Sequence, residues 1–334
     1  MNGRMLSGVL VVLALAGSRF ARAADEPPAP KKVPVVFAAF ATSIREPWNQ
    51  VIHAALRQAE QDGRVRYEWK DALDTVEKQL AAVERAVADK TDIVVADSVD
   101  ARDEILAVAR RHPAVAFLIA GAGEPQKPNV STFDSALVEP AYLCGLLAGR
   151  LTKSNVIGVV AGKREPEPHR TINAFLSGCR EANGEVKVRV EFIDSWFDPE
   201  KARAAALKQI AAGADVIFAE RAGALAAVRE TGVRAFGNMV DQHAEAPDHV
   251  ITGAIWNMQP AIDHVVSRVA DGVVEAENLQ RFATLAKGGV ALAPWHGQDE
   301  KLPAAVLEEV KKRQAEIVAG THVVPSDPAE PKAD

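Results

Sequence analysis

The chain has few of the residues that mark most catalytic and metal-binding sites. Its 334 residues include only two cysteines and eight histidines, and no two histidines have the H-x-x-x-H spacing of a zinc-binding helix. We therefore expect neither a disulfide framework nor a zinc site. Cys144 and Cys179 lie among apolar residues of expected helices. We interpret both as buried free thiols that behave as small hydrophobic residues.

The motifs of common enzymes are also missing. Residues 121–123 (GAG) follow an expected strand, but the next residues are EP, which cannot open a helix beneath a pyrophosphate. Residues 152–154 (TKS) lack the Gly-rich loop of a phosphate-binding turn, and no G-x-S-x-G elbow occurs. We expect no catalytic residue, no cofactor and no metal, and therefore a binding protein rather than an enzyme.

No apolar run near the N-terminus is long enough to cross a bilayer comfortably. The run at residues 6–17 follows Arg4 and precedes residues 21–23 (ARA), a small-x-small cleavage site. This pattern predicts a signal peptide at residues 1–23, with an uncleaved membrane anchor as the alternative. No cysteine lies near the cleavage point. We therefore expect a periplasmic protein without a lipid anchor.

Positive charge is in deficit, since the formal net charge is −6. This balance disfavours nucleic acid or an anionic membrane surface as the main partner. Aromatic residues are scarce too, at 5% of the chain, whereas apolar residues reach 48%. A chain of this length and composition can build two hydrophobic cores.

After a Pro-rich tether at residues 24–32, the pattern alternates between apolar runs and segments of helical periodicity. Continuous apolar runs are typical of strands buried on both faces of a parallel sheet. The expected strands include residues 33–40, 92–96, 115–120, 156–161, 186–193, 215–219 and 234–237. Repeated strand–helix units predict an α/β fold with two doubly wound parallel-sheet lobes.

The stretch from residue 131 to residue 198 is interpreted as the crossing between these lobes. An apolar helix at residues 137–151 ends in a polar turn, and a new apolar strand at residues 156–161 begins a second series of units. Ligands of open parallel sheets bind beyond the carboxyl ends of the strands. The sequence therefore predicts a ligand site in a cleft between the lobes.

Several short motifs resemble the basic membrane protein family of periplasmic substrate-binding proteins, whose known members bind purine bases or nucleosides for uptake transporters. The motifs are WN at 48–49, AYLCGLLAG at 141–149, INAF at 172–175, WFDP at 196–199, GADVI at 213–217 and APW at 293–295. The resemblance extends from residue 33 to residue 324.

It implies a type I periplasmic-binding-protein fold whose lobes are joined by three crossovers, near residues 134–155, 252–258 and 287–292. The N-terminal lobe would then contain residues 33–135 and 258–287, and the C-terminal lobe residues 154–252 and 292–324. Residues 325–334 are expected to form a disordered tail.

The resemblance and the strand ends together give a set of candidate ligand-binding residues. They are Trp48, Asn49, Asp97, Ser98, Glu167, Glu220, Asn238, Met239, Asp241 and Trp256. Trp48 matches the family aromatic that stacks on the base, with simple packing as the alternative. Asn49 is equally well explained as a helix cap, and Glu167 as a solvated loop charge. Trp196 and Phe197 are interpreted as structural.

Some positions depart from the family pattern. Met239 stands where the family has an aspartate that reads the base, and residues 222–224 (AGA) offer no second stacking aromatic. Trp256 replaces a family lysine or acid, and the loop at residues 42–47 lacks the usual Gly-Asp. These departures leave open a bare base, another flat heterocycle and a different small solute.

We therefore expect a monomeric solute-binding protein that captures a purine-like heterocycle and delivers it to an ABC permease in the inner membrane. A periplasmic ligand-sensing module is the alternative from another class, and a family member with a diverged, non-purine ligand is a third possibility. An exported nucleoside-processing enzyme has less support, because no nucleophile or metal-binding set is evident in the sequence.

Overall fold

The computed structural model describes Met1 and residues 32–334, except residues 98, 99 and 122. The predicted signal peptide and most of the tether therefore lie outside the described residues, and so does the candidate residue Ser98. Residues 32–334 form one unit, which is described below. Within the described part of the chain, none of the helices combines the length and the apolar character needed to cross a bilayer.

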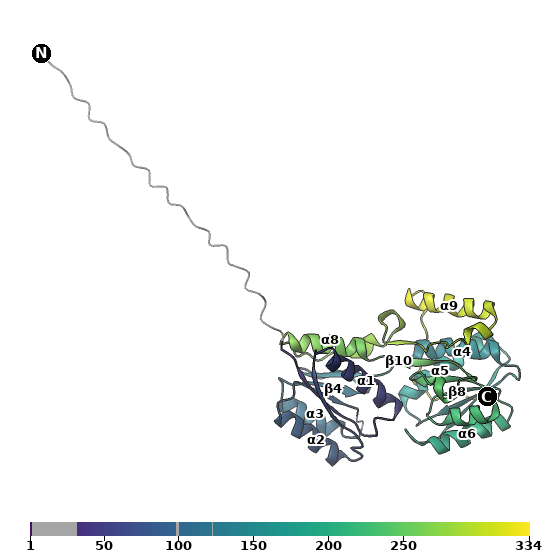
Figure 1. The fold of residues 1–334 in the computed structure, drawn as a ribbon, viewed down its shortest axis with the longest axis horizontal. Helices are drawn as coiled ribbons and strands as arrows, with labels where there is room; N and C mark the ends of the chain where they lie inside the picture. Colours follow the sequence, from purple (N-terminus) through teal and green to yellow (C-terminus); the bar gives the residue numbers. More distant parts are fainter. Residues whose placement is uncertain (2–31, 98–99, 122) are drawn as a thin grey trace. The chain divides into compact units, whose positions relative to one another are not determined.

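The first half of this unit forms a parallel sheet in the strand order β2-β1-β3-β4-β5. The strands are β1 Val35–Ala39, β2 Arg66–Lys70, β3 Ile93–Ala96, β4 Ala116–Ala120 and β5 Val130–Phe133. Strands β3, β4 and β5 are buried along their whole length, as expected for continuous apolar runs. The helices between them are α1 Pro47–Gln61, α2 Val76–Ala88 and α3 Arg102–Arg111 (Figure 1).

The second sheet has the strand order β11-β10-β9-β8-β6-β7 and is parallel except for β11, which pairs antiparallel to β10. Its strands are β6 Val156–Ala161, β7 Lys187–Phe192, β8 Val216–Ala219, β9 Arg234–Met239, β10 Val250–Trp256 and β11 Val290–Leu292. The helices that connect β6 to β9 are α5 Pro166–Ala182, α6 Pro199–Ala211 and α7 Ala224–Thr231.

Three connections link the two lobes. The chain leaves the first sheet after β5 and enters α4 Val138–Leu151, which packs on α5. After β10 it returns as α8 Gln259–Ala270, which packs on α1, and it then comes back to the second sheet at β11. The final helix, α9 Ala304–Val318, packs on α4 (Figure 1). The predicted fold class of two parallel-sheet lobes joined by three crossovers is confirmed.

The last residues of the chain lie against the second lobe, in contrast to the expected disordered tail. Asn173 Nδ2 donates hydrogen bonds to the carbonyl oxygens of Asp327 and Ala329, at 3.0 and 2.8 Å. Asp334 exchanges hydrogen bonds with Val188 on β7, through its backbone N–H and its carboxylate. These bonds place the tail beside the edge strand of the second sheet, where it covers part of an otherwise open edge.

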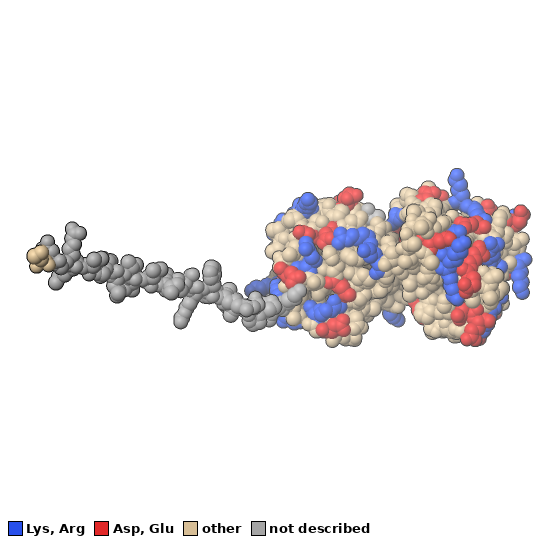
Figure 2. Space-filling view, turned by 90° about the horizontal axis from the view of Figure 1, so that it is seen from above, with Lys and Arg blue, Asp and Glu red and all other residues tan. Residues whose placement is uncertain are grey.

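Acidic and basic side chains are interspersed on the face seen in Figure 2. Some form exposed ion pairs that join neighbouring helices, such as Arg203 with Glu230 and Arg150 with Glu309. Exposed pairs of this kind contribute about 0–1 kcal/mol each. Stability therefore rests mainly on the buried apolar cores.

Both cysteines are free and fully buried, in α4 and α5. Burial raises the pKa of each thiol well above its usual value, so both stay protonated at neutral pH. A buried thiol in apolar surroundings is a poor nucleophile. Cys144 and Cys179 therefore act as small packing residues.

Glycines allow α4 and α5 to approach closely. A Cβ atom on Gly145 would lie 2.1 Å from the carbonyl oxygen of Phe175, and one on Gly178 would lie 2.2 Å from the carbonyl oxygen of Tyr142. Both obstructing atoms belong to the helix backbone, which cannot rotate away as a flexible side chain can. This interface joins the first crossover to the core of the second lobe.

We predict that Gly145→Ala lowers the free energy of unfolding by at least about 2 kcal/mol, because the added methyl group separates the two helices. Gly184→Ala is the matched control, since nothing lies within 4 Å of a Cβ atom at that exposed glycine. Its effect should stay within about 0.5 kcal/mol. Urea unfolding of both variants checks this, and equal stabilities would contradict the packing argument.

Candidate functional site

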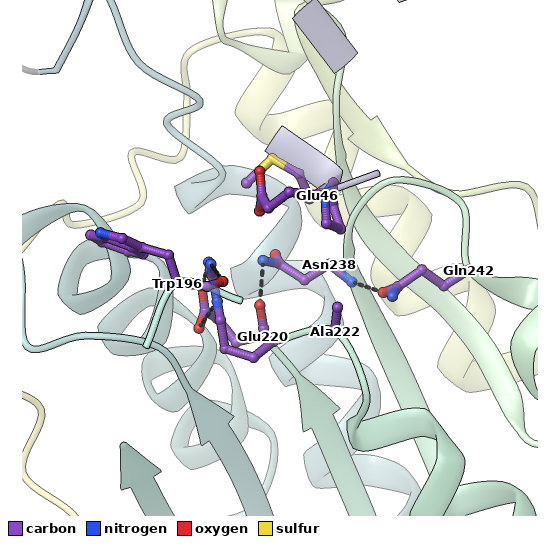
Figure 3. Close-up of a pocket in the computed structure, with 9 residues that line it drawn as sticks. Glu46, Trp196, Glu220, Ala222, Asn238 and Gln242 are labelled. Atoms are coloured by element: carbon purple, nitrogen blue, oxygen red, sulfur yellow. Dashed lines mark hydrogen bonds and ion pairs between the residues drawn. The ribbon is translucent and has the colours of Figure 1, made fainter. Parts of the chain in front are cut away.

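A small cavity lies at the carboxyl ends of β8 and β9, where the loop before α1 meets the second lobe (Figure 3). We call it the interlobe cavity. Its lining residues are Glu46, Pro47, Trp196, Glu220, Arg221, Ala222, Asn238, Met239 and Gln242. Its volume of about 10 Å³ is roughly that of one water-sized probe. At this point the two lobes therefore leave almost no free space between them.

A buried ion pair forms one wall of the cavity. Arg221 and Glu220 are 7% and 4% exposed, and the guanidinium binds both carboxylate oxygens of its neighbour. The same carboxylate accepts a hydrogen bond from the backbone N–H of Gly162, 2.9 Å away. Burial alone would lower the pKa of Arg221, but Glu220 outweighs it and raises that pKa. The arginine is therefore a fixed positive charge.

Glu46 brings a carboxylate from the first lobe to the same place. It is the N-cap of α1, because its side chain accepts a hydrogen bond from the backbone N–H of Asn49 and Pro47 follows at the first helical position. The residue is only 7% exposed. Burial raises its pKa, and Arg221 on the second lobe offsets part of that rise. A capping residue thus also faces the cavity.

A second group of charges lies at the first crossover. Arg170 on α5 binds the buried carboxylate of Asp134 at 2.6 Å, and the Ser135 hydroxyl donates to Glu167 at 2.9 Å. Burial raises the pKa of Glu167 to about 8, and the nearby carboxylates of Asp134 and Glu220 add to the rise. Glu167 therefore belongs to the electrostatic surroundings of the cavity.

Asp97 and Asn49 lie on the side of the first lobe. Asp97 accepts a hydrogen bond from the backbone N–H of Ala41 at 2.7 Å, and burial raises its pKa to about 7. Asn49 is fully buried, and its Nδ2 donates to Thr42 and Ser43. These bonds hold the loop between β1 and α1. The amide nitrogen of Asn49 is thus engaged within the protein, and a ligand contact by this residue stays a prediction.

Trp48, Phe133 and Trp256 form an aromatic wall beside the loop that carries Glu46. The ring centroids of Trp48 and Trp256 are 4.7 Å apart, and both rings lie 6.2 Å from that of Phe133. A planar ligand cannot fit between the two tryptophans, since a stacked ring needs about 3.5–4 Å on each side. Trp256 also borders an open cleft of about 500 Å³.

Two candidate positions leave β9 in different directions. Met239 ends the strand in a left-handed conformation, with φ of 73°, and lines the cavity. Asp241 is exposed and lies outside the cavity lining, where its carboxylate pairs with His296 Nε2 at 2.7 Å. The structure therefore brings Glu220, Asn238 and Met239 together and leaves Asp241 on the surface.

The candidate set omitted several cavity residues, namely Glu46, Pro47, Arg221, Ala222, Gln242 and Trp196. Arg221 follows the end of β8 directly after Glu220. The rule that ligands bind beyond the carboxyl ends of strands, which selected Glu220, therefore also applies to Arg221. The ring of Trp196 lies 5.6 Å from the Arg221 guanidinium, and its carbonyl accepts a hydrogen bond from that group. Trp196, interpreted from sequence as structural, therefore both supports Arg221 and lines the cavity.

The fold and the cavity define a class of proteins in which two parallel-sheet lobes meet around a small site. A sequence profile of the Bmp family, described as ABC transporter substrate-binding protein PnrA-like, matches residues 33–327. The chain belongs to this family, which confirms the resemblance seen in its motifs. Among the described residues, no group of His, Cys, Asp or Glu is arranged to hold a metal ion.

Individual relatives agree with this assignment. A purine-binding protein of Brucella abortus is 28% identical over 65% of this chain and 61% of that protein. A putative ABC transporter glucose-binding protein of Haloferax volcanii is 29% identical over 67% of this chain and 58% of that protein. The chain thus spans about three fifths of the length of these relatives.

A solved ABC transporter solute-binding protein of Aeropyrum pernix superposes with a TM-score of 0.74 at 17% identity, covering 88% of this chain and 94% of that one. The similarity in structure extends over both lobes. The fold is therefore the type I periplasmic-binding-protein fold.

The raised pKa of Glu167 predicts that stability falls as the pH rises. The folded protein keeps a proton on this carboxyl up to about pH 8, whereas the unfolded chain releases it near the ordinary value of 4.5. The folded state thus binds more protons between these values, and its free energy of unfolding decreases as pH increases through this window. Asp97 acts in the same direction between 3.8 and about 7.

Thermal unfolding between pH 5 and pH 9 tests the contribution of Glu167. In Glu167→Gln the melting temperature should fall less steeply than in the wild type, because the buried ionisation is gone. Glu165→Gln, at an exposed position two residues earlier, should keep the wild-type slope. Identical slopes in the wild type and Glu167→Gln would contradict the assignment.

Proposed function

We propose that this protein captures a small flat heterocycle, such as a purine base or a nucleoside-like solute, between its lobes for an ABC importer. The observation that carries the proposal is the aromatic wall, whose Trp48 directly follows the cavity residues Glu46 and Pro47 in the chain. An aromatic face beside a few carboxylates and amides suits a ring that has both N–H donors and acceptors. The names of two relatives include a purine and glucose, so the choice of solute rests on this site's own chemistry.

Capture requires the lobes to separate and close again. The cavity of about 10 Å³ is far smaller than a purine, so the loop at Glu46 and Pro47 must move away from the second lobe before a solute can enter. A ligand favours the closed form only through contacts that it makes better there than in the open form. Residues of both lobes line the cavity, which suits this mechanism.

The proposal includes export to the periplasm, a monomeric state and a permease partner in the inner membrane. Export rests on the N-terminal signal pattern, and the permease on the family description of ABC transporter substrate-binding proteins. A ligand-sensing module without transport uses the same closure. Uptake measured with and without the protein in a cell that carries the matching permease separates the two.

We predict that Trp48→Ala weakens solute binding by at least about tenfold, which corresponds to about 1.4 kcal/mol. The loss combines a stacked contact of about 0.5–1.5 kcal/mol with the burial of the ring. A thermal-shift screen with nucleobases, nucleosides and other flat heterocycles first identifies a ligand. Isothermal titration calorimetry then compares the affinities of the wild type and the variant.

Trp69→Ala is the matched control for this experiment. Trp69 lies on the edge strand β2, is 37% exposed, and its ring contacts His53 and Tyr67 rather than the aromatic wall. Its replacement should leave the affinity within about threefold. Wild-type affinity in Trp48→Ala would make Trp48 a packing residue and remove the main support for a flat ligand.

A further inference from the structure

The charges around the interlobe cavity do not balance. The carboxyl groups that line it are those of Glu46 and Glu220, and the guanidinium that lines it is that of Arg221. This guanidinium is already engaged with Glu220. The cavity lining therefore contains one carboxyl group more than its own guanidinium pairs with.

Glu46 is the excess carboxylate that lines the cavity itself. It is 7% exposed, and within the described part of the chain it forms no ion pair. Its carboxylate accepts a hydrogen bond from the backbone N–H of Asn49, and this bond caps the start of α1. Arg221 acts on Glu46 by lowering its pKa. The Arg221 guanidinium, however, is already bound to both carboxylate oxygens of Glu220. A positive group in the cavity would compensate this charge directly.

A second and independent observation points to a hydrogen-bond donor in the same place. Asn238 is 3% exposed, and its Oδ1 has no hydrogen-bond partner among the described residues. Its Nδ2 donates to the carbonyl oxygen of Glu220 at 3.2 Å. Because a carbonyl oxygen only accepts, this bond identifies Oδ1 as the amide atom that lacks a partner.

Figure 3 shows the Asn238 amide between Glu46 and the Glu220 backbone. A buried acceptor without a partner is uncommon in folded proteins and unfavourable. The donor that Asn238 Oδ1 lacks would come from a bound molecule. That molecule would approach Asn238 from the interlobe cavity, which Glu46 lines from the first lobe.

Resting on the proposed function, we propose that the solute is a cation whose N–H groups bind the Glu46 carboxylate on one lobe and Asn238 Oδ1 on the other. A planar amidinium or a protonated amino-heterocycle has this chemistry. A neutral ring would satisfy Asn238 but leave Glu46 uncompensated. An anion would meet repulsion from the surrounding carboxylates.

Benzamidine, benzamide and benzoate test the sign of the charge, because they place a cation, a neutral group and an anion on the same ring. Calorimetry at pH 8 with the mature chain compares the three, together with adenine and guanine as neutral purines. We expect benzamidine to bind at least about tenfold more tightly than benzamide, and benzoate not to bind. This comparison uses the wild type, so it does not depend on whether a variant folds.

A variant then tests the role of Glu46. Glu46→Gln should weaken benzamidine binding by at least about tenfold, whereas Glu104→Gln, at an exposed position on α3, should leave it unchanged. A thermal melt confirms that each variant is folded. Wild-type affinity in folded Glu46→Gln would overturn the assignment of this carboxylate.

The outcomes separate this inference from the proposed function. If adenine or guanine binds and benzamidine binds no better than benzamide, the inference is wrong and the heterocycle-binding function stands. If benzamidine binds and the neutral purines do not, the inference stands and the ligand is not a neutral purine. If none of the five compounds binds, the inference is wrong, and the thermal-shift screen with nucleosides and other flat heterocycles decides the heterocycle-binding function.

Discussion

The buried ion pair between Glu220 and Arg221 is the interaction on which the rest of the site depends. It binds the end of β8 to the end of β6, because Glu220 also accepts the backbone N–H of Gly162. A side chain at Gly162 would meet Arg221, since a Cβ atom there would lie 2.9 Å from its Cδ. Removing either charge would leave the other buried without compensation, which destabilises proteins strongly. The charges of Glu220 and Arg221 also act on the pKa values of Glu46 and Glu167.

The start of α1 combines a structural role with the recognition role proposed above in consecutive residues. Glu46 caps the helix, Pro47 fixes its first turn, and Trp48 contributes to the aromatic wall. Asn49 holds the preceding loop through its amide nitrogen. The segment that borders the cavity is thus anchored to the first lobe by ordinary helix-capping bonds. A movement of that lobe would carry the carboxylate and the ring together.

The sequence predicted the lobes well, because long apolar strands and helical periodicity are strong local signals. The strand-end rule also selected Glu220 and Asn238, which line the cavity, and their contact with a ligand stays a prediction. Asp241, selected by the same rule, lies outside the cavity lining, because the chain turns to the surface after the left-handed backbone at Met239, and nothing in a methionine indicates such a conformation. Glu46 was missed because a glutamate before a proline has the pattern of a helix cap, which it also is.

The cost of burying polar groups also explains why the closed form is unfavourable when no solute is bound. The proposed closure would remove water from Glu46 and from the acceptor of Asn238. Asn238 Oδ1 has no partner in the closed form, and Arg221, which acts on Glu46 from the second lobe, is already paired with Glu220. Opening restores hydration to both groups, so closure without a solute is opposed. A solute that supplies the missing positive charge and donor removes that penalty only in the closed form. Affinity and closure would then arise from the same two polar groups on opposite lobes, because a ligand shifts a conformational equilibrium only by its differential affinity for the two states.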